Sequence, residues 1–198
     1  MPFNTLKISC LVLLAGFATA VDARSPQGNF KKGQAADRAG FALQFDADFG
    51  GDRLLTVNFE DGDDQDIDAG QGIALSFGGW FRPMAESNFT IHALLGYKYV
   101  TTAATNADIT VTRTVAQLNG LYRFPNGFYM GGGLMMHFGP ELDGDDYFYD
   151  IQFDDAPGFT AELGYRWVGL HYTKMKYKTD FFDDVDASHI GLRITYEF

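Results

Sequence analysis

The sequence of 198 residues contains a single cysteine, Cys10, which lies in an apolar segment near the amino terminus. If that segment is cleaved, as argued below, the mature chain has no disulfide, no cysteine nucleophile and no cysteine metal ligand. Lys and Arg are also scarce, since 15 of them stand against 26 acidic residues and give a net charge of -11. This balance argues against a nucleic-acid-binding protein, which requires basic patches.

Long apolar runs are missing as well. No stretch has the roughly 18 uninterrupted apolar residues that a transmembrane helix needs. The run 8–18 is only about 11 residues long, which is typical of the core of a secretion signal rather than of a membrane span or a buried helix. Lys7 precedes it, and Ala18, Thr19 and Ala20 form a small-residue cleavage site. We therefore predict export through the Sec pathway with cleavage after residue 20, or alternatively after residue 23.

Without apolar helices, a chain can cross a bilayer only as a closed β-barrel. Apolar and polar residues alternate with period two in eight segments of about 9–12 residues, the length of tilted membrane strands. The segments are 41–49, 73–81, 89–99, 113–124, 128–138, 159–167, 170–178 and 190–198. Their connections alternate between long (50–69, 101–108, 139–157, 179–187) and short (82–88, 125–127, 168–169). Long loops on one side and short turns on the other are the outer-membrane arrangement.

The sequence thus predicts an all-β protein, an eight-stranded antiparallel transmembrane up-and-down β-barrel in residues 38–198. A signal peptide (1–20) and a periplasmic tether (21–37) are expected before it. Phe, Tyr, Leu and Met gather on one face of the predicted strands, and smaller or charged residues on the other. An eight-stranded barrel has little internal space, so the bulky face should point to lipid. A soluble lipocalin-type barrel, with that face inward, is the alternative.

The last segment, 190–198, ends in Phe and carries apolar residues at alternate positions before it. Tyr196 and Phe198 are expected to form the signal that the barrel assembly machinery recognises. Together with the signal peptide and the eight strands, this ending resembles the small outer-membrane barrels of the opacity-protein and outer-membrane-protein-A type. The resemblance implies a Gram-negative outer-membrane location beside lipid and lipopolysaccharide. It does not imply one activity, because these families include adhesins, structural proteins and lipid-modifying enzymes. We expect a monomer.

Charged residues on the predicted inward face are expected to form a paired polar core. The planar fork of Arg pairs well with carboxylates, and pairing is what a buried charge requires. The predicted members are Asp46, Asp48, Lys98, Arg113, Arg123, Glu162, Arg166, Arg193 and Glu197. In the seventh segment the alternation is less regular, and we place Lys174 and Lys176 inward, with Thr173, Met175 and Tyr177 outward. The alternative interpretation of the charged lumen is a narrow conducting path.

Acidic residues concentrate in the long segments 50–69, 139–157 and 179–187. Oxygen-only ligands suit calcium or magnesium, so Asp61, Asp63, Asp64, Asp66 and Asp68 are candidate ligands for a divalent cation. Their spacing departs from the EF-hand pattern. The simpler interpretation is a solvated surface whose charges repel one another.

We predict no catalytic residues and no cofactor. His171, Tyr172 and Thr173 distantly resemble the His-x-Ser pair of outer-membrane lipid A deacylases, although Thr replaces Ser. The predicted turn at 168–169 places His171 near the periplasmic side, as an interfacial aromatic beside Trp167. The predicted function is a structural or surface-interaction role, in adhesion or in contact with cations or ligands. A small channel for ions or solutes and a lipid-modifying enzyme are the alternatives.

Overall fold

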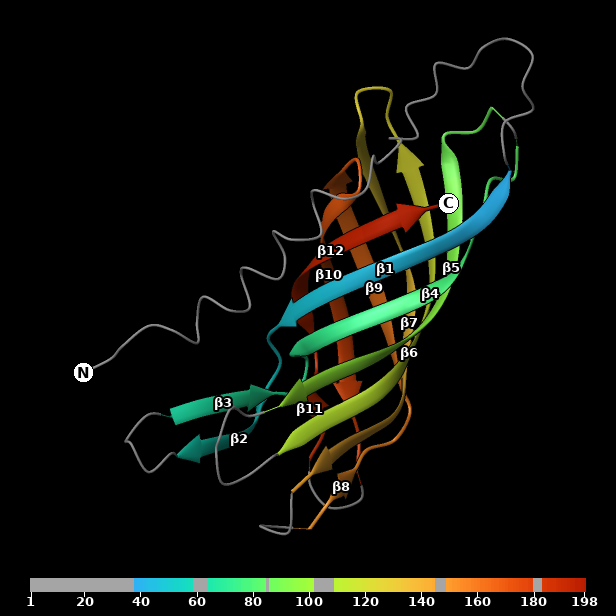
Figure 1. The fold of residues 1–198 in the computed structure, drawn as a ribbon. Coiled ribbons are helices and arrows are strands. Elements are labelled where there is room, and N and C mark those ends of the chain that lie inside the picture. Colours follow the sequence, from blue (N-terminus) through green and yellow to red (C-terminus); the bar gives the residue numbers. More distant parts are fainter. Residues whose placement is uncertain (1–37, 59–63, 85, 102–108, 145–148, 180–182) are drawn as a thin grey trace. The chain divides into compact units, whose positions relative to one another are not determined.

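The computed structural model describes residues 38–58, 64–84, 86–101, 109–144, 149–179 and 183–198 (Figure 1). The predicted signal peptide and tether lie outside these residues. All regular structure in the described part of the chain is β-strand. That part contains no helix long and apolar enough to cross a membrane.

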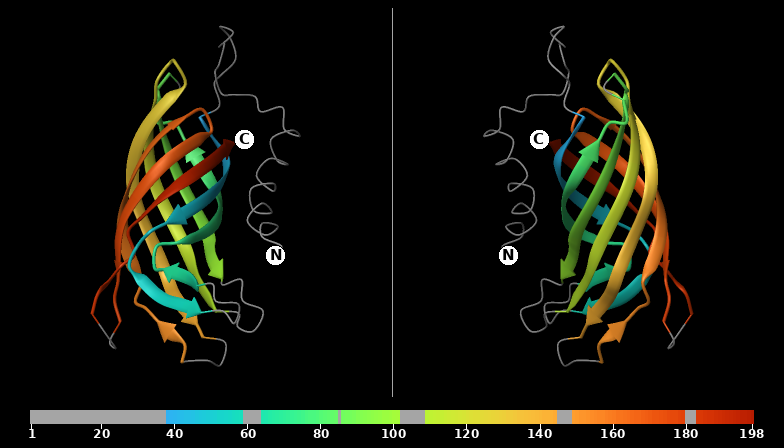
Figure 2. Two further views of the ribbon diagram at one scale, coloured as in Figure 1. Left: turned by 90° about the vertical axis from the view of Figure 1, so that its left-hand side faces the viewer. Right: turned by 90° about the vertical axis from the view of Figure 1, so that its right-hand side faces the viewer.

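Eight antiparallel strands close into a barrel, which confirms the predicted fold class (Figures 1 and 2). Each strand pairs with the next one along the chain, and the last pairs with the first. The barrel strands are β1 (Ala39–Phe49), β4 (Gly72–Phe81), β5 (Phe89–Thr101), β6 (Thr110–Arg123), β7 (Phe128–Asp143), β9 (Ala156–Tyr165), β10 (Val168–Tyr177) and β12 (His189–Glu197). Because every edge is paired, the barrel backbone has no open sheet edge.

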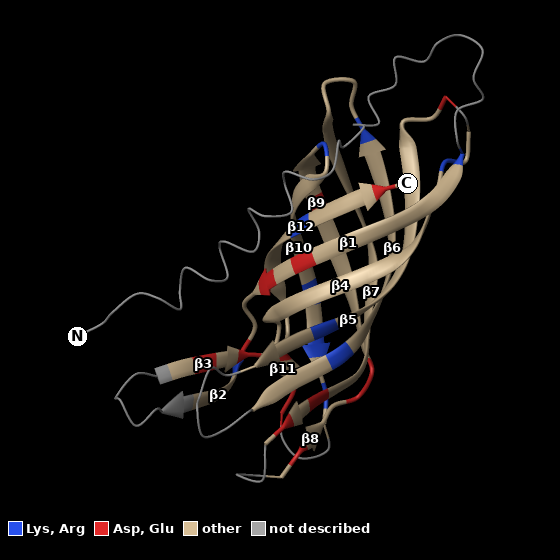
Figure 3. Cartoon of the chain, in the orientation of Figure 1, with Lys and Arg blue, Asp and Glu red and all other residues tan. Residues whose placement is uncertain are grey.

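Four shorter strands lie in the long connections. β2 (Arg53–Asn58) and β3 (Asp64–Asp68) form a hairpin, β8 (Ile151–Gln152) pairs with β7, and β11 (Val185–Asp186) pairs with β10. They gather at one end of the barrel, here called the long-loop end (Figure 2). The chain terminus at Phe198 lies at the opposite end, called the short-turn end. Figure 3 shows acidic residues along β3 and β8 and the segments beside them.

The two faces of the barrel wall differ in chemistry, as the alternation predicted. Large apolar side chains point outward, and Phe159 and Leu163 on β9 are 73% and 60% exposed. Charged side chains point inward, and Arg193 and Lys98 are 0% and 1% exposed. A barrel in water would bury its apolar side chains instead, so this arrangement is inverted relative to a soluble barrel of the lipocalin kind.

The lumen is apolar at the long-loop end. A cluster of buried side chains fills it there, with the inner residues of the hairpin β2–β3 among them: Ile67, Ala69, Val100, Ile109, Val111, Val115, Met135, Leu142, Phe153, Ala156, Met175, Tyr177 and Ala187. The hairpin therefore contributes its base to the inside of the barrel, and it does not simply project from the rim.

One turn and one strand face differ from the prediction. The sixth connection consists of Arg166 and Trp167, with Arg166 at φ 57, rather than of residues 168–169. On β10 the side chains of Thr173, Met175 and Tyr177 are buried, while Lys174 and Lys176 are exposed. The inward placement of these lysines was wrong. Met175 and Tyr177 belong to the internal cluster at the long-loop end. At this end of the barrel the inner face of β10 is therefore the apolar one.

Candidate functional site

The lumen contains three groups of paired charges, one above another along the barrel. Glu197 of β12 is the centre of the group at the short-turn end. Its carboxylate lies 2.9 Å from His92 Nε2 and 3.4 Å from an Arg82 guanidinium nitrogen, and Arg123 also pairs with it. The Arg82 guanidinium lies 4.6 Å from the Trp80 ring centroid. One acid thus serves three basic side chains from β5, the end of β6 and the turn after β4.

Arg193 is the centre of the middle group. Its Nε donates to Asp46 Oδ1 over 2.7 Å, and its Nη1 donates to Glu162 Oε2 over 2.8 Å. The Tyr129 hydroxyl donates to the other oxygen of Glu162, Oε1, over 2.7 Å. Gln44 donates to Asp46 Oδ2 over 2.8 Å. Both acids therefore have several donors, which is what makes a buried carboxylate tolerable.

Tyr129 needs space that two glycines provide. A Cβ at Gly164 or Gly169 would overlap the Tyr129 ring or its hydroxyl. Gly164 pairs with Gly169, so neither β9 nor β10 has a side chain at this level. The small residues here allow the hydroxyl of Tyr129 to reach Glu162.

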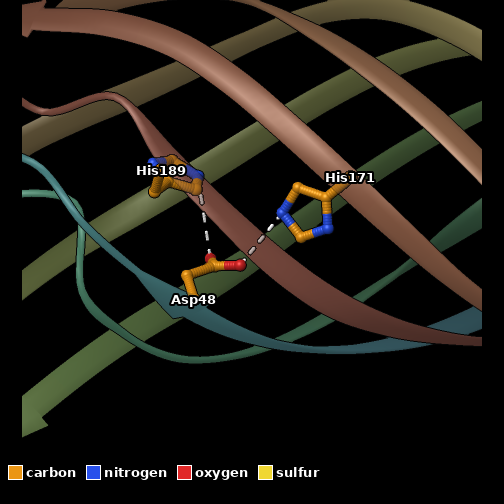
Figure 4. A group of neighbouring side chains, drawn as sticks. All are labelled: Asp48, His171 and His189. Carbon is orange, nitrogen blue, oxygen red and sulfur yellow. Dashed lines mark ion pairs between the residues drawn. The ribbon is translucent and has the colours of Figure 1, made fainter.

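The third group lies below the long-loop end and contains Asp48, Lys98 and two histidines (Figure 4). Lys98 Nζ is 2.7 Å from Asp48 Oδ2 and donates to the Gly70 carbonyl over 2.6 Å. Asp48 Oδ1 is 2.9 Å from His171 Nε2, and Asp48 Oδ2 is 3.7 Å from His189 Nε2. β1, β5, β10 and β12 supply these four side chains.

Three further contacts of basic and aromatic side chains surround this third group. Arg113 donates to the carbonyl of Gln71, next to Gly70 at the base of the hairpin. His137 Nδ1 is 2.7 Å from the Tyr177 hydroxyl, and the His137 ring stacks on His189 with centroids 6.0 Å apart. Cations from β5 and β6 thus hold the base of the β2–β3 hairpin, above a set of histidines.

The structure places eight of the nine predicted network residues on the inside of the barrel or at its rim: Asp46, Asp48, Lys98, Arg113, Arg123, Glu162, Arg193 and Glu197. The placement of Arg166 in the network was wrong. It is exposed in the turn between β9 and β10, with its guanidinium 5.2 Å from the Tyr165 ring centroid. The alternation that put it inward ends at Tyr165, where the strand ends.

The interfacial position predicted for His171 was also wrong. His171 is buried in the lumen and pairs across the sheet with Gly191 of β12. The chain has four histidines, and all of them, His92, His137, His171 and His189, are buried. The alternation of apolar and polar residues in 89–99 and 128–138 is sufficient to place His92 and His137 on the inner face. The grouping of His137, His171 and His189 did not, because it depends on the relative register of β7, β10 and β12.

The proposed loop ligands for a divalent cation do not come together in the described residues. Asp61 and Asp63 lie outside those residues, and Asp64 begins β3. Asp66 pairs with Arg53 at 2.6 Å and accepts a hydrogen bond from Thr56, so it has partners within its own hairpin. Asp68 follows two positions later on β3, with its backbone N–H donating to Gln71. In the part of the chain that the structure describes, one group of three possible metal ligands occurs: Asp48, His171 and His189.

The long connections are tied together at the long-loop end by two acids. Asp52 N–H donates to the Asp186 carbonyl over 2.6 Å, and Asp186 N–H donates to Asp52 Oδ2 over 2.8 Å. Hydrogen bonds from the Ser188 hydroxyl and N–H lower the pKa of the Asp186 carboxyl below its usual value. Asp186 therefore acts as a turn-forming acid between β11 and β12.

Tyr196 and Phe198, predicted to form the assembly signal, lie at the short-turn end. Their rings meet edge to face, with centroids 4.6 Å apart. The Phe198 side chain points outward and is 64% exposed. Its N–H donates to the Phe41 carbonyl over 2.8 Å, and its own carbonyl accepts from Trp80 Nε1 over 3.2 Å. The last residue is therefore fixed by backbone contacts while its ring remains available on the exterior.

Comparison with known proteins adds no relative. The sequence matches no protein-family model, and no curated protein matches it significantly. Inference about function therefore depends on the barrel and on the side chains inside it.

Proposed function

We propose that this protein is an integral β-barrel of a Gram-negative outer membrane, with a structural or surface-interaction role and a closed lumen. Export through the Sec pathway, insertion by the barrel assembly machinery, and contact with outer-membrane lipid and lipopolysaccharide belong to this proposal. The proposal depends on the inverted barrel, in which bulky apolar side chains cover the exterior and acidic and basic side chains are buried inside. Lipid is the solvent in which such an exterior is stable.

The exposed apolar side chains come from all eight barrel strands. Those more than half exposed include Phe41, Phe49, Ile73, Leu75, Phe77, Leu95, Tyr97, Leu118, Met130, Leu134, Phe159, Leu163, Leu170, Ile190 and Leu192. Monomeric soluble proteins rarely expose an apolar patch of more than a few hundred Å², so a belt around the whole barrel requires an apolar partner. A bilayer supplies that partner on every side at once.

The burial and the hydrogen-bond partners of the charged side chains favour a closed lumen over a channel. Arg193 and Arg113 are among the largest side chains that are fully buried, and both have oxygen partners. The internal apolar cluster, which includes Ile67 and Phe153, lies between these charges and the long-loop end. Eight strands leave an interior that side chains can just fill.

The deacylase-like alternative receives no support from the position of its residues. His171 and Thr173 are both buried in the lumen, and the Thr173 hydroxyl lies 4.0 Å from Met135 Sδ. A lipid substrate would approach from the exterior of the barrel, where Tyr172, the residue between His171 and Thr173, is exposed.

The acidic loops are the surface that we assign to interaction with cations, ligands or other cells.

Cell fractionation and planar-bilayer recording test the proposal together. The full chain, expressed in a Gram-negative host, should fractionate with the outer membrane and show heat-modifiable gel mobility. The purified barrel should give little steady conductance. Recovery in a soluble fraction would contradict the membrane location, whereas large stable conductance from a correctly inserted barrel would replace the closed lumen with a channel.

A further inference from the structure

We propose that Asp48, His171 and His189 form a binding site for a divalent transition-metal ion, of which Zn²⁺ is the representative, inside the barrel. Each residue offers one ligand atom, and these atoms lie within 4.8 Å of one another (Figure 4). Zn²⁺ binds imidazole nitrogen and carboxylate oxygen at about 2.0–2.2 Å. Ligand atoms around one tetrahedral ion are therefore separated by somewhat more than 3 Å on this scale, so small side-chain movements suffice.

The hydrogen bonding of His189 prepares it for this role. Its Nδ1 lies 2.9 Å from the Ala187 carbonyl oxygen, which can only accept a hydrogen bond. The Nδ1 atom must therefore carry the proton, and Nε2 faces Asp48 with a free lone pair. Metal-binding histidines commonly have this arrangement, in which one ring nitrogen donates to a carbonyl and the other binds the ion.

His171 and Asp48 supply the second observation. Among the described residues, both ring nitrogens of His171, the Nε2 of His189 and the Oδ1 of Asp48 are buried and make no hydrogen bond. His171 Nε2 and Asp48 Oδ1 face each other at 2.9 Å. Buried polar atoms of this kind are costly unless something satisfies them. An ion bound by one atom of each residue would satisfy three of these four atoms.

Lys98 does not have to leave for the ion to bind. The Asp48 carboxylate faces Lys98 with Oδ2 and His171 with Oδ1, so the two oxygens are already divided between two partners. Oδ1 can bind the ion while Lys98 keeps Oδ2 and its bond to the Gly70 carbonyl. A hydrogen-bonded outer oxygen is usual for a carboxylate that binds a metal, because the bond fixes its orientation.

The ligand set selects a class of ion. Two imidazoles and one carboxylate suit Zn²⁺, Co²⁺, Ni²⁺ or Cu²⁺, whereas Ca²⁺ and Mg²⁺ prefer sites made of oxygen alone. The site also joins β1, β10 and β12, the strands on both sides of the seam where the barrel closes. A bound ion would therefore brace that seam. This inference stands on lumen geometry, independent of the membrane location proposed above.

The test uses the full chain without an affinity tag, refolded into detergent micelles after treatment with a chelator. Co²⁺ is added before refolding in one sample and after refolding in another, because the apolar cluster can restrict entry. We expect one equivalent to bind, with the visible absorption band of a low-symmetry four-coordinate cobalt site. Zn²⁺ should displace it, Ca²⁺ should not, and Zn²⁺ should raise the midpoint of thermal unfolding.

Three variants and a matched control locate the site. Asp48→Asn, His171→Gln and His189→Gln should each weaken Co²⁺ binding by at least about tenfold. His92→Gln removes another buried histidine at the opposite end of the lumen and should leave binding unchanged. Heat-modifiable mobility identifies which variants have folded. If all three variants fail to fold, the change in the unfolding midpoint of the unaltered protein on addition of Zn²⁺ still tests whether the folded barrel binds the ion.

Two results would overturn the site. One is the absence of both the cobalt band and the Zn²⁺ shift under both loading conditions. The other is binding that Ca²⁺ displaces or that persists at full strength in the folded ligand variants, which would assign the ion to the acidic loops.

Discussion

Lys98 Nζ on β5 lies 2.6 Å from the carbonyl oxygen of Gly70, so a cation of the lumen holds the base of the β2–β3 hairpin. Arg113 on β6 does the same for the neighbouring carbonyl of Gln71. Through Lys98, the hairpin is also linked to Asp48 on β1. The order of this outer segment therefore depends on side chains inside the barrel.

Lys98→Met should loosen the hairpin and destabilise the barrel. The substitution removes the donor to Gly70 and leaves Asp48 without its ammonium partner, a loss of about 3–5 kcal/mol when a buried pair is broken. Hydrogen exchange measured by mass spectrometry should increase in residues 64–72. Lys174→Met, on the exposed face of β10, is the control and should change neither property. Unchanged exchange in Lys98→Met would show that the apolar cluster alone holds the hairpin.

Arg193→Met should lower the free energy of unfolding by about 3–5 kcal/mol, because it strands Asp46 and Glu162 in a buried site. Urea unfolding in lipid vesicles, followed by tryptophan fluorescence, measures the loss. Adding Asp46→Asn to this variant should recover part of it, since one unpaired charge is then gone. A loss below 1 kcal/mol for Arg193→Met would indicate that water reaches the middle of the lumen.

A charge on the outward face of β9 should be costly in a bilayer. Leu163→Arg is expected to destabilise the protein by about 2–4 kcal/mol, the cost of Arg near the midplane of a membrane barrel. Asp154→Arg places the same side chain at an exposed position before β9 and should be close to neutral. The two variants are compared by urea unfolding in vesicles. Equal stabilities would mean that Leu163 does not face lipid.

Gly164→Val should displace Tyr129. The new side chain would overlap the Tyr129 ring, and the hydrogen bond from its hydroxyl to Glu162 would be lost. Overpacking of this kind typically costs about 1–3 kcal/mol. Combining it with Tyr129→Ala should restore much of the stability, because the clash is gone. If Gly164→Val is equally destabilising with and without Tyr129, the cost arises from the strand and not from the ring.

Phe198→Asp should reduce the amount of barrel assembled in the outer membrane while secretion to the periplasm continues. The exposed ring of Phe198 is the feature that the assembly machinery is expected to recognise. Heat-modifiable mobility in membrane fractions provides the measurement. Trp80→Phe, which removes the bond to the Phe198 carbonyl and alters the packing around it, is the control for a local packing defect. Normal membrane levels of Phe198→Asp would count against the signal.

The residues that the sequence predicted correctly are those for which alternation and topology suffice. Asp46 and Arg193 project inward from the first and last strands, and closure of the barrel must bring those strands together. Arg166 and Lys174 were misplaced for two reasons. A two-residue turn at 166–167 was expected two positions later, and the apolar residues Met175 and Tyr177 fill the lumen where the expected pattern put them in lipid.

The group of Asp48, His171 and His189 was not predictable from any local pattern. Asp48 of β1 and His171 of β10 both pair with Gly191 of β12, and His189 lies two positions before Gly191. The acidic loops were the predicted place for a cation because acidic residues are frequent there. A high count of acidic residues in one segment does not show whether their oxygen atoms lie close together. An ion binds only where several ligand atoms do.

The seam between β1 and β12 also determines when the Asp46–Arg193 pair can form during folding. Asp46 and Arg193 are 147 positions apart, so their bond waits until nearly the whole chain has been made and its last strand has docked. Until that strand docks, Asp46 and Glu162 lack the guanidinium that they share in the folded barrel. A contact this distant in sequence forms slowly, and a chain that lacks the last strand cannot close the barrel.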